Sequence, residues 1–367
     1  MKQNKKFYVG AMTGTSHDAI DISFIDIEKN ISLKYFYSKK MPTYIKAEIK
    51  RCIESQNVSL SELGKLNKAV GILFSRTIQE AIKKSKLKRQ QIGCISISGQ
   101  TIRHEIDKKN PFSMQIGDPN IISVETGLPV IHDFRNMHIA LGGEGAPLVP
   151  EFHTKLFYKP NTPRIILNIG GIANYSYVKN KNVVWGSDVG PGNALMDFYC
   201  QKFLNKPFDT NGKIASKGKI LENELKKLLN ISFFKKSFPK STGKELFNTK
   251  LFSTTLLKNS PENILATLAE LTVVSISDAI KKNKHQFDDL IICGGGAKNK
   301  FLINRISNLV SKDVMLSENL GYDVQAIESM AFAWMGYKRL NNESLKVQLK
   351  KNKYNKGLLG SVTLSKP

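Results

Sequence analysis

The sequence predicts an α/β protein with two domains, and three observations support this. The chain has 367 residues, and at roughly 100–200 residues per domain this length suggests two. Hydrophobic residues make up 41% of the chain, enough for sizeable cores. A strand, a glycine-containing turn and a returning strand open each half, and helices follow each time. The pattern therefore predicts two α/β domains facing a cleft.

The first half opens with a predicted hairpin. Residues 7–13 are strand-like, residues 14–18 form a Gly/Thr/Ser/His/Asp turn, and residues 19–27 alternate between apolar and polar types, which is the period of a strand. The next predicted elements are helices at 44–54 and 60–85, a strand at 92–98, a helix from Asp118-Pro119 to about Gly127, and a short strand at 130–132.

The second half repeats this opening. An apolar strand at 164–169, a turn at Gly170-Gly171 and a strand at 172–178 form a second predicted hairpin. A strand at 183–185 then leads to Asp188, which we expect just beyond the strand end. The remaining predicted elements are helices at 194–204 and 262–282, a buried strand at 290–293, and helices at 299–310 and 325–340.

The charge is strongly positive but dispersed. The formal net charge is +24, yet only 8 of the 55 basic residues are Arg, and the Lys residues occur in every segment. Specific reading of bases favours Arg on a localised face. We therefore expect a solvated, lysine-rich surface that attracts anionic substrates such as nucleotides and sugar acids, and no nucleic-acid partner.

Cysteine usage and hydropathy point to the cytoplasm. The four cysteines form no CxxC pair, so we expect them to be reduced and buried. No stretch of about 18 uncharged apolar residues occurs, and the N-terminus lacks the apolar region of a signal peptide. These observations predict a cytoplasmic protein with no membrane partner.

Three glycine turns are candidate nucleotide sites. The hairpin loop around Gly14 offers backbone N–H groups and hydroxyls to phosphate, although it lacks the Gly-Lys-Ser/Thr end of a Walker loop. Gly170-Gly171 is the matching turn of the second half. Gly294, Gly295 and Gly296 follow a buried strand and would let a flat group such as adenosine lie on the backbone. An ordinary tight turn remains the alternative at each.

Several polar residues are candidates for chemistry. Asp188 precedes a glycine loop and can accept a proton, although it could also simply order that loop. Glu328 shares a helix face with apolar residues, where an acid needs a partner or a function. Asp18 and Asp21 could face a phosphate-bound magnesium ion through water. Polar groups at strand ends, which suit a small hydroxyl- and carboxylate-bearing molecule, occur at 99–104, 115–118 and 133–135.

These motifs, in this order, closely resemble those of the anhydro-N-acetylmuramic acid kinase family, within the acetate/sugar kinase, Hsp70 and actin superfamily. The matching stretches span nearly the whole chain: 12–21, 99–104, 115–119, 133–135, 142–152 (GGEGAPLVPEF), 167–174, 188–197 (DVGPGNALMD), 241–248, 293–299 and 328–334.

The resemblance implies a fold and a reaction. The fold would consist of two RNase H-like domains, as in actin-like ATPases, flanking a nucleotide and substrate cleft. Residues 1–158 plus 326–367 would form the phosphate-1 and sugar domain, and residues 159–325 the phosphate-2 and adenosine domain. The enzyme would use ATP and Mg²⁺ to convert 1,6-anhydro-N-acetylmuramic acid and water to N-acetylmuramic acid 6-phosphate in cell-wall recycling.

The resemblance also assigns residues. Asp188 lies in the motif that holds the family's general base. The expected ATP residues are Gly14, Thr15, Ser16, His17, Asp18, Ala19, Ile20, Asp21, Gly170, Gly171, Gly294, Gly295, Gly296 and Asn299. The expected substrate residues are Gln100, Thr101, Arg135, Asn193 and Glu328, and the expected metal-site residues are Asp18 and Asp21, through water.

The chain departs from the family pattern at four positions. Thr13, Ala19, Ser98 and Ser329 stand where the family commonly has Ser, Gly, His and Gly. Ser98 lacks the imidazole of the family's histidine at this position and cannot take over a role that needs it, but its hydroxyl can still form hydrogen bonds. Two other functions stay open: a hexosamine kinase of the same fold acting on a free hydroxyl, and a non-catalytic ATP-binding regulator. The oligomeric state, a homodimer included, is also open.

Overall fold

The chain forms two units, each built on one mixed β-sheet. The computed structural model describes residues 6–14, 17–55, 57–106, 109–181, 185–243, 246–349 and 353–364. Residues Met1–Leu148 with Ala326–Pro367 form the first unit, and Val149–Gln325 form the second. The sequence-based boundary between the two domains follows residue 158, whereas in the structure the second unit already includes helix α5 (Pro150–Phe157). Helix α5 belongs there because His153 Nδ1 lies 2.9 Å from Ser176 Oγ in the second sheet.

The first unit contains a six-stranded sheet in the order β15-β7-β4-β1-β2-β3. Strand β2 is antiparallel to its neighbours β1 and β3, β4 is parallel to β1 and to β7, and β15 is antiparallel to β7. Two separate ribbons, β5-β6 and β13-β14, complete its strands. The bounds are β1 Phe7–Thr13, β2 Ala19–Asp26, β3 Ser32–Lys40, β4 Ile92–Ser98, β5 Gln100–Glu105, β6 Phe112–Ile116, β7 Val130–His132, β13 Leu345–Gln348, β14 Tyr354–Gly357 and β15 Ser361–Thr363.

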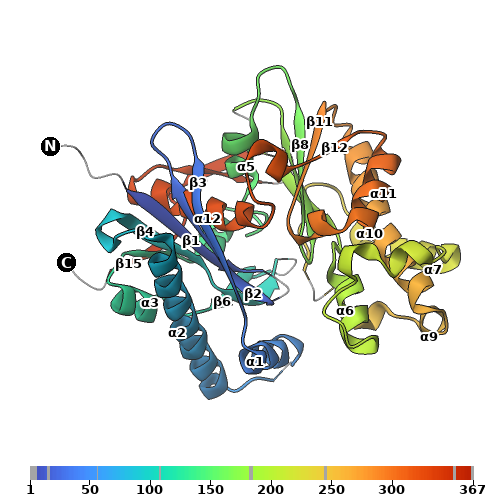
Figure 1. Ribbon diagram of the computed structural model, residues 1–367, viewed down its shortest axis with the longest axis horizontal. Helices are drawn as coiled ribbons and strands as arrows, with labels where there is room; N and C mark the ends of the chain where they lie inside the picture. The colour runs from blue at the N-terminus through green and yellow to red at the C-terminus, as the bar shows by residue number, and fades with distance from the viewer. Residues whose placement is uncertain are drawn as a thin grey trace. The chain divides into compact units, whose positions relative to one another are not determined.

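Helices cover both faces of this sheet, and strand alternation decides which residues each helix meets. Val9, Ile22 and Phe24 belong to the core beneath helices α1 and α2. On the other face, α12 contacts β1, β2 and β4 (Figure 1). Gly10 is required there, because a Cβ atom on it would lie 1.9 Å from the carbonyl oxygen of Ser329. The helices are α1 Thr43–Glu54, α2 Leu60–Ser85, α3 Pro119–Thr126, α4 Phe134–Ala140 and α12 Ala326–Leu340, with a 3₁₀ turn at Arg89–Gln91.

The second unit contains a five-stranded sheet in the order β10-β9-β8-β11-β12. Its core lies between the sheet and helices that include α6, α10 and α11. The bounds are β8 Arg164–Ile169, β9 Ala173–Val178, β10 Trp185–Gly190, β11 Asp289–Cys293, β12 Val314–Leu316, α6 Ala194–Phe203, α7 Glu222–Leu229, α8 Ser232–Lys235, α9 Thr254–Leu257, α10 Pro261–Asn283 and α11 Lys300–Val310, with 3₁₀ turns at Thr210–Gly212, Ala215–Lys217, Thr249–Leu251, Gly295–Lys298 and Ser317–Leu320.

Helix α10 is the central helix of this core. By length and composition alone it could cross a membrane, but 83% of its most apolar window is buried inside the structure. Such burial is typical of the core helix of a folded domain. Ser260 caps its first turn by accepting a hydrogen bond from the Asn263 N–H group, with Pro261 at the first helical position.

The two sheets share one strand order. If the strands of each sheet are numbered in chain order, both sheets contain the spatial order 3-2-1-4-5. These strands are β3-β2-β1-β4-β7 in the first unit and β10-β9-β8-β11-β12 in the second. This repeat confirms the prediction of two RNase H-like α/β units. One local prediction is wrong: Asp188 lies within β10 rather than beyond a strand end, because pairing with β9 continues to Gly190. Residues 183 and 184 of the predicted strand lie outside the described residues.

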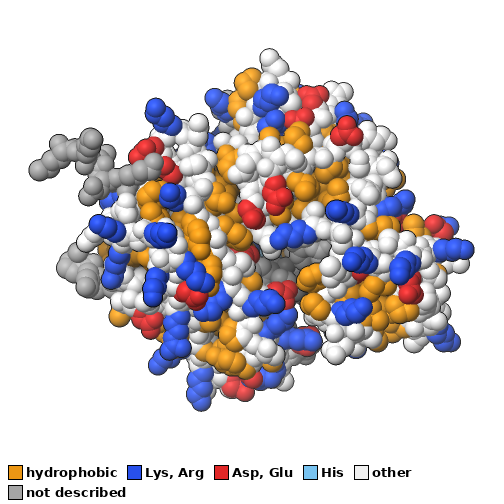
Figure 2. Space-filling view, viewed as in Figure 1, with side chains coloured by type: hydrophobic (Ala, Val, Ile, Leu, Met, Phe, Trp, Pro, Cys, Tyr) orange, Lys and Arg blue, Asp and Glu red, His pale blue; other side chains and the backbone are white. Residues whose placement is uncertain are grey.

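The basic side chains are dispersed on the face shown in Figure 2. Lys and Arg side chains occur over both units there, interspersed with Asp and Glu. The four cysteines are free and buried, as the sequence predicts.

Candidate functional site

The candidate catalytic carboxylate, that of Asp188, lies at the end of a row of paired residues in the second sheet. Cys293 of β11 pairs with Asn168 of β8, Asn168 with Asn174 of β9, and Asn174 with Asp188 of β10. Residues directly opposite in neighbouring strands carry their side chains on the same face. Cys293, Asn168 and Asp188 are buried, whereas Asn174 is half-buried. The row therefore places Asp188 at the end of a largely buried polar line across the sheet.

The carboxylate of Asp188 is held by a segment distant in sequence. Its Oδ2 atom accepts hydrogen bonds from Ser241 Oγ (3.1 Å) and from the Thr242 N–H group (2.9 Å). The Asp188 N–H group donates to the Lys240 carbonyl oxygen (3.0 Å). These bonds fix the orientation of a carboxylate that is only 4% exposed, as a general base requires.

Ser241 and Thr242 hold the candidate base, Asp188, and the sequence predicts no role for either of them. Their segment, residues 241–248, appears only among the stretches that resemble the family. No periodicity connects them with Asp188, because the bonds span more than 50 residues of chain. Residues 244 and 245 of the segment lie outside the described residues.

The two glycine turns nearest Asp188 pack against each other. The Asn193 N–H group donates to the Gly170 carbonyl oxygen (2.9 Å), and the Ala194 N–H group donates to that of Gly171 (3.0 Å). Gly192 has φ +52°, and a Cβ atom on it would lie 2.5 Å from the Gly170 carbonyl oxygen. The Asn193 side chain donates to the Ile169 carbonyl oxygen (3.3 Å). The structure thus brings Gly170, Gly171 and Asn193 together at the start of α6.

The three consecutive glycines have different environments. A Cβ atom on Gly294, whose φ is +83°, would lie 2.4 Å from Asn168 Oδ1, and one on Gly296 would lie 2.4 Å from the Ile169 side chain. A Cβ atom on Gly295 would meet nothing within 4 Å. Two of the glycines are therefore needed for packing, whereas Gly295 leaves open space beside the backbone. Asn299 caps α11 by accepting from the Leu302 N–H group (3.1 Å), which gives it a structural partner.

In the first unit, the predicted phosphate hairpin is described only in part. Thr15 and Ser16 lie outside the described residues. The His17 N–H group donates to the Gly14 carbonyl oxygen (3.0 Å) and closes the turn. Ile20 is 1% exposed and belongs to the core, so only its backbone could meet a ligand.

The two predicted metal-site acids differ in their surroundings. Asp18 is exposed and forms an ion pair with Lys46. Asp21 is half-buried in β2. Among the residues that the structure describes, no group of three or more His, Cys, Asp or Glu side chains could hold a metal ion. Contact of these two carboxylates with magnesium through water therefore stays a prediction.

The polar residues after β4 form one hydrogen-bonded group. Gln100, only 1% exposed, accepts from Thr13 Oγ1 at its Oε1 atom (2.9 Å). The Gln115 amide donates to Ser98 Oγ (3.1 Å) and to Thr101 Oγ1 (3.2 Å). Ser98, at the position where the family commonly has His, thus takes part in this group. Gln100 and Thr101 have protein partners here, and their roles toward a substrate stay predictions.

Arg135 lies in a group of basic side chains around the loop that contains Gly145. Its guanidinium donates to the Gly145 carbonyl oxygen (2.8 Å), while the Gly145 N–H group donates to His138 Nδ1 (3.0 Å). Burial and the positive charge of Arg135 lower the pKa of His104 and of His138 to about 4. Both imidazoles are therefore neutral at pH 7, and Arg135 is the charged member of this group.

Glu328 lies in the first turns of α12 and is half-buried. Ala331, Phe332 and Met335, which share its face by helical spacing, are buried, as predicted. The neighbouring Ser329 replaces the glycine common in the family. Its Oγ atom lies 2.7 Å from Ser23 Oγ in β2, so the extra hydroxyl has a buried partner.

Comparisons with known proteins agree with these features. The family model described as anhydro-N-acetylmuramic acid kinase matches residues 6–363. A protein of that name from Gamma-proteobacterium EBAC31A08 is 62% identical over 363 residues, which cover 99% of this chain and all of the relative. One from Pasteurella multocida is 39% identical over 350 residues, covering 93% and 92%.

A solved structure is similar in fold. Component A of the (R)-2-hydroxyglutaryl-CoA dehydratase from Acidaminococcus fermentans superposes with a TM-score of 0.50 at 12% identity, covering 92% of this chain and all of that one. At this identity the likeness concerns the fold alone.

Proposed function

The chain belongs to the anhydro-N-acetylmuramic acid kinase family, and from that membership we propose that it phosphorylates 1,6-anhydro-N-acetylmuramic acid. The family resemblance drawn from the motifs is thereby confirmed. The proposed reaction consumes ATP and water and yields N-acetylmuramic acid 6-phosphate and ADP, a step of cell-wall recycling in the cytoplasm.

One observation carries the catalytic part of this proposal: the Asp188 carboxylate is buried and held by Ser241 and Thr242. Opening the anhydro bond requires a nucleophile at C1, and water is a poor one unless a base takes its proton. A carboxylate with a fixed orientation can be that base. We assign this role to Asp188.

Asp188 would start a sequence of bond changes in which all atoms balance. Its carboxylate takes a proton from water and later releases it to solvent, and the water oxygen bonds to C1 of the sugar. The bond between C1 and O6 breaks, and O6 bonds to the γ-phosphorus of ATP. The bond from that phosphorus to the β,γ-bridging oxygen then breaks, and ADP leaves. In-line transfer of this kind depends chiefly on alignment and charge neutralisation.

The nucleotide would be held mainly by backbone groups. We propose that Gly170, Gly171 and Gly295 contact ATP in the second unit, and that the hairpin from Gly14 to Asp21 contacts its phosphates. The open space at Gly295 supports this, because a flat group could approach the backbone there. Magnesium would neutralise phosphate charge, and Asp18 and Asp21 would hold its water shell.

Substrate recognition would use the polar residues described above. Arg135, with its permanent charge, suits the lactyl carboxylate of the sugar. Gln100, Thr101, Asn193 and Glu328 would contact its hydroxyl and acetamido groups. The dispersed positive charge would favour the encounter with two anionic substrates.

Product analysis in labelled water tests the proposal. The protein is incubated with ATP, magnesium, the anhydro sugar and H₂¹⁸O, and the sugar product is examined by mass spectrometry. We expect a 6-phosphorylated sugar with one ¹⁸O at C1. A phosphorylated sugar without ¹⁸O would instead indicate a kinase that acts on a free hydroxyl. Absence of any sugar-dependent ADP formation would contradict both.

A further inference from the structure

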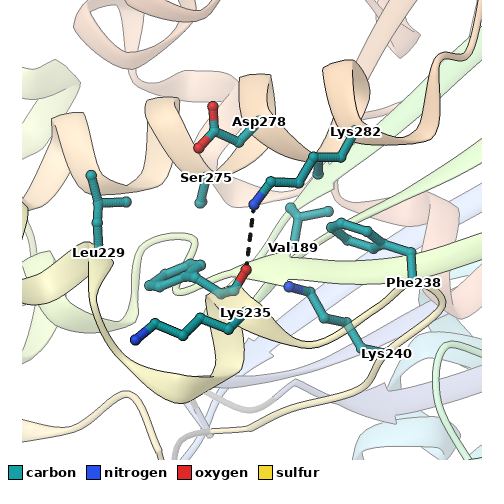
Figure 3. A pocket seen from close by; sticks show the side chains of 10 residues that line it. Val189, Leu229, Lys235, Phe238, Lys240, Ser275, Asp278 and Lys282 are labelled. Carbon is teal, nitrogen blue, oxygen red and sulfur yellow. Dashed lines mark hydrogen bonds between the residues drawn. The ribbon is translucent and has the colours of Figure 1, made fainter.

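A small cavity of about 170 Å³ lies in the second unit beside α8, α10 and β10 (Figure 3). It lies on the face of β10 that carries Val189, whereas Asp188 belongs to the polar row on the other face. Three lysines and two phenylalanines dominate its lining: Lys235, Lys240, Lys282, Phe234 and Phe238. Nothing in the proposed kinase reaction uses this cavity.

Lys240 is the most unusual of the three lysines. It is only 4% exposed, and its ammonium group donates to the Phe233 carbonyl oxygen (2.9 Å). The ammonium also lies 4.2 Å and 4.3 Å from the ring centres of Phe233 and Phe238. Among the residues that the structure describes, no carboxylate forms an ion pair with it. A buried charge of this kind is costly without a counter-charge.

The other charged groups do not supply that counter-charge. The Lys282 ammonium donates to the Phe234 carbonyl oxygen (3.5 Å), as the dashed line in Figure 3 shows. Burial, Lys282 and Lys236 together lower the pKa of Lys240 to about 8. Asp278, the acid that lines the cavity, is exposed and forms no ion pair with these lysines within the described ranges. The cavity lining therefore carries an excess of positive charge, with three lysines and one aspartate.

We propose that this cavity binds a small organic phosphate, a monoester whose apolar or aromatic body packs against Phe234 and Phe238. Lysine ammonium groups are common phosphate ligands, and a dianion would offset the charges of Lys240 and Lys282. Three cations favour a phosphate over a carboxylate, because the phosphate carries nearly two charges at pH 7.

Lys240 connects the cavity with Asp188, the candidate general base. The Lys240 N–H group donates to Ser187 Oγ (2.9 Å), and its carbonyl oxygen accepts from the Asp188 N–H group (3.0 Å). The next two residues, Ser241 and Thr242, hold the Asp188 carboxylate. A ligand that draws the Lys240 ammonium toward itself therefore acts on the segment that orients Asp188. This effector role rests on the proposed function, whereas the binding site does not.

Calorimetry on the full chain, without nucleotide or sugar, tests the site with phenyl phosphate as the probe. We expect saturable binding that weakens at least tenfold in Lys282→Met and in Lys240→Met. Lys281→Met removes the same charge from the adjacent position of α10, which does not line the cavity, and is expected to leave binding unchanged. Saturable binding that is equal in the Lys281 and Lys282 variants, or no saturable binding, overturns the site.

Two further probes test the chemistry of the ligand. Benzoate keeps the ring but has one charge, and inorganic phosphate keeps the charge but has no apolar body. Both are expected to bind more weakly than phenyl phosphate. Equal binding of benzoate overturns the phosphate assignment, and equal binding of inorganic phosphate overturns the role of Phe234 and Phe238. Because Lys240→Met alters a buried residue, its thermal unfolding is measured as well, and Lys282→Met carries the conclusion if Lys240→Met unfolds.

The effector role has its own measurement. Turnover of the anhydro sugar is followed at saturating substrates with and without phenyl phosphate. We expect a change in kcat in the parent and in Lys281→Met, and none in Lys282→Met. An unchanged kcat in the parent overturns the effector role. A protein without kinase activity would overturn the proposed function and leave the calorimetric test of the site intact.

Discussion

Corresponding rows of the two sheets carry different side chains. In the first unit the row across the fourth, first, second and third strands is Ser98, Met12, Asp21 and Ser38. In the second unit it is Cys293, Asn168, Asn174 and Asp188. Each row has one acid, but the acid lies on the second strand of the first unit and on the third strand of the second.

The two acids also differ in how they are held. Asp21 is half-buried at the hairpin, whereas Asp188 is buried and fixed by Ser241 and Thr242. In the first unit the row lies on the sheet face that α12 covers, and in the second unit it lies on the face that α5 covers. Each of these helices begins where the chain passes from one unit into the other. One topology thus carries a half-buried acid in one unit and a buried, hydrogen-bonded acid in the other.

The largest expected effect separates these two acids. Asp188→Asn keeps the shape and removes the basicity, so we expect kcat to fall roughly 10²–10⁴-fold with near-normal ATP affinity. Asp21→Asn, the matched change in the first unit, is expected to raise the KM for ATP and to lower kcat less. Steady-state kinetics and nucleotide titration measure both. Turnover of Asp188→Asn within tenfold of the parent would exclude it as the base and direct attention to Glu328 or Asp133.

The next effect distinguishes binding from packing within one glycine run. Gly295→Val places a side chain in open space, so we expect unchanged thermal stability and an affinity for ATP at least about tenfold lower, or about 1.4 kcal/mol. Gly296→Val meets the Ile169 side chain, and we expect it to lose about 1–3 kcal/mol of unfolding free energy. Urea unfolding and nucleotide titration compare the pair. Parent-like ATP affinity in Gly295→Val would contradict the adenosine assignment.

A smaller effect concerns the hydrogen bonds that hold Asp188. Ser241→Ala removes the hydroxyl donor, and we expect kcat to fall about tenfold, since a hydrogen bond to a charged group contributes about 1.5–3 kcal/mol. Thr242→Ala is the control, because the donor there is the backbone N–H group and is retained. The pH profile of kcat should shift in Ser241→Ala and stay unchanged in Thr242→Ala. Equal kinetics for the two variants would rule out a positioning role for Ser241.

The last prediction concerns the pKa of the buried Lys240 ammonium group. Lys46, paired with Asp18, is partly exposed, whereas burial lowers the pKa of Lys240 from 10.5 to about 8. Between pH 8 and 10.5 the Lys240 side chain therefore keeps its proton in the unfolded chain and has lost it in the folded protein. The unfolding free energy of the parent should therefore rise with pH, relative to Lys240→Met, from about pH 8 to 10.5. Urea unfolding at pH 7.5, 9 and 10 measures this, and parallel profiles would show that Lys240 keeps its ordinary pKa.

The sequence predicts the long, periodic elements well. The hairpin of β1 and β2, the helix α2 and the core helix α10 have bounds within a residue or two of those predicted, because their apolar spacing and caps are local signals. It does not predict β3, in which no side chain is fully buried and alternation is weak, or the three-residue β12 and β15. Edge strands with few buried side chains depend on tertiary pairing rather than on their own sequence.

The sequence predicts which residue types form the candidate site, but not the contacts that hold them in place. Asp188 and the glycine turns stand out because of residue type and spacing. The partners of Asp188 come from residues 241 and 242, and the buried bond between Gln100 and Thr13 joins residues far apart in the chain. Such long-range polar contacts leave no periodicity in the sequence. The different roles of Gly294, Gly295 and Gly296 likewise follow from Asn168 and Ile169, on another strand.

The late position of α12 in the sequence sets an order for synthesis. Residues 149–325 form a unit with its own core, so they can fold as soon as they leave the ribosome. The first unit, although its strands are made first, cannot cover one face of β1, β2 and β4 until residues 326–340 emerge. During that interval this face, including the bare backbone at Gly10, is open to other chains. The half of the protein that is translated first is therefore the half that finishes folding last.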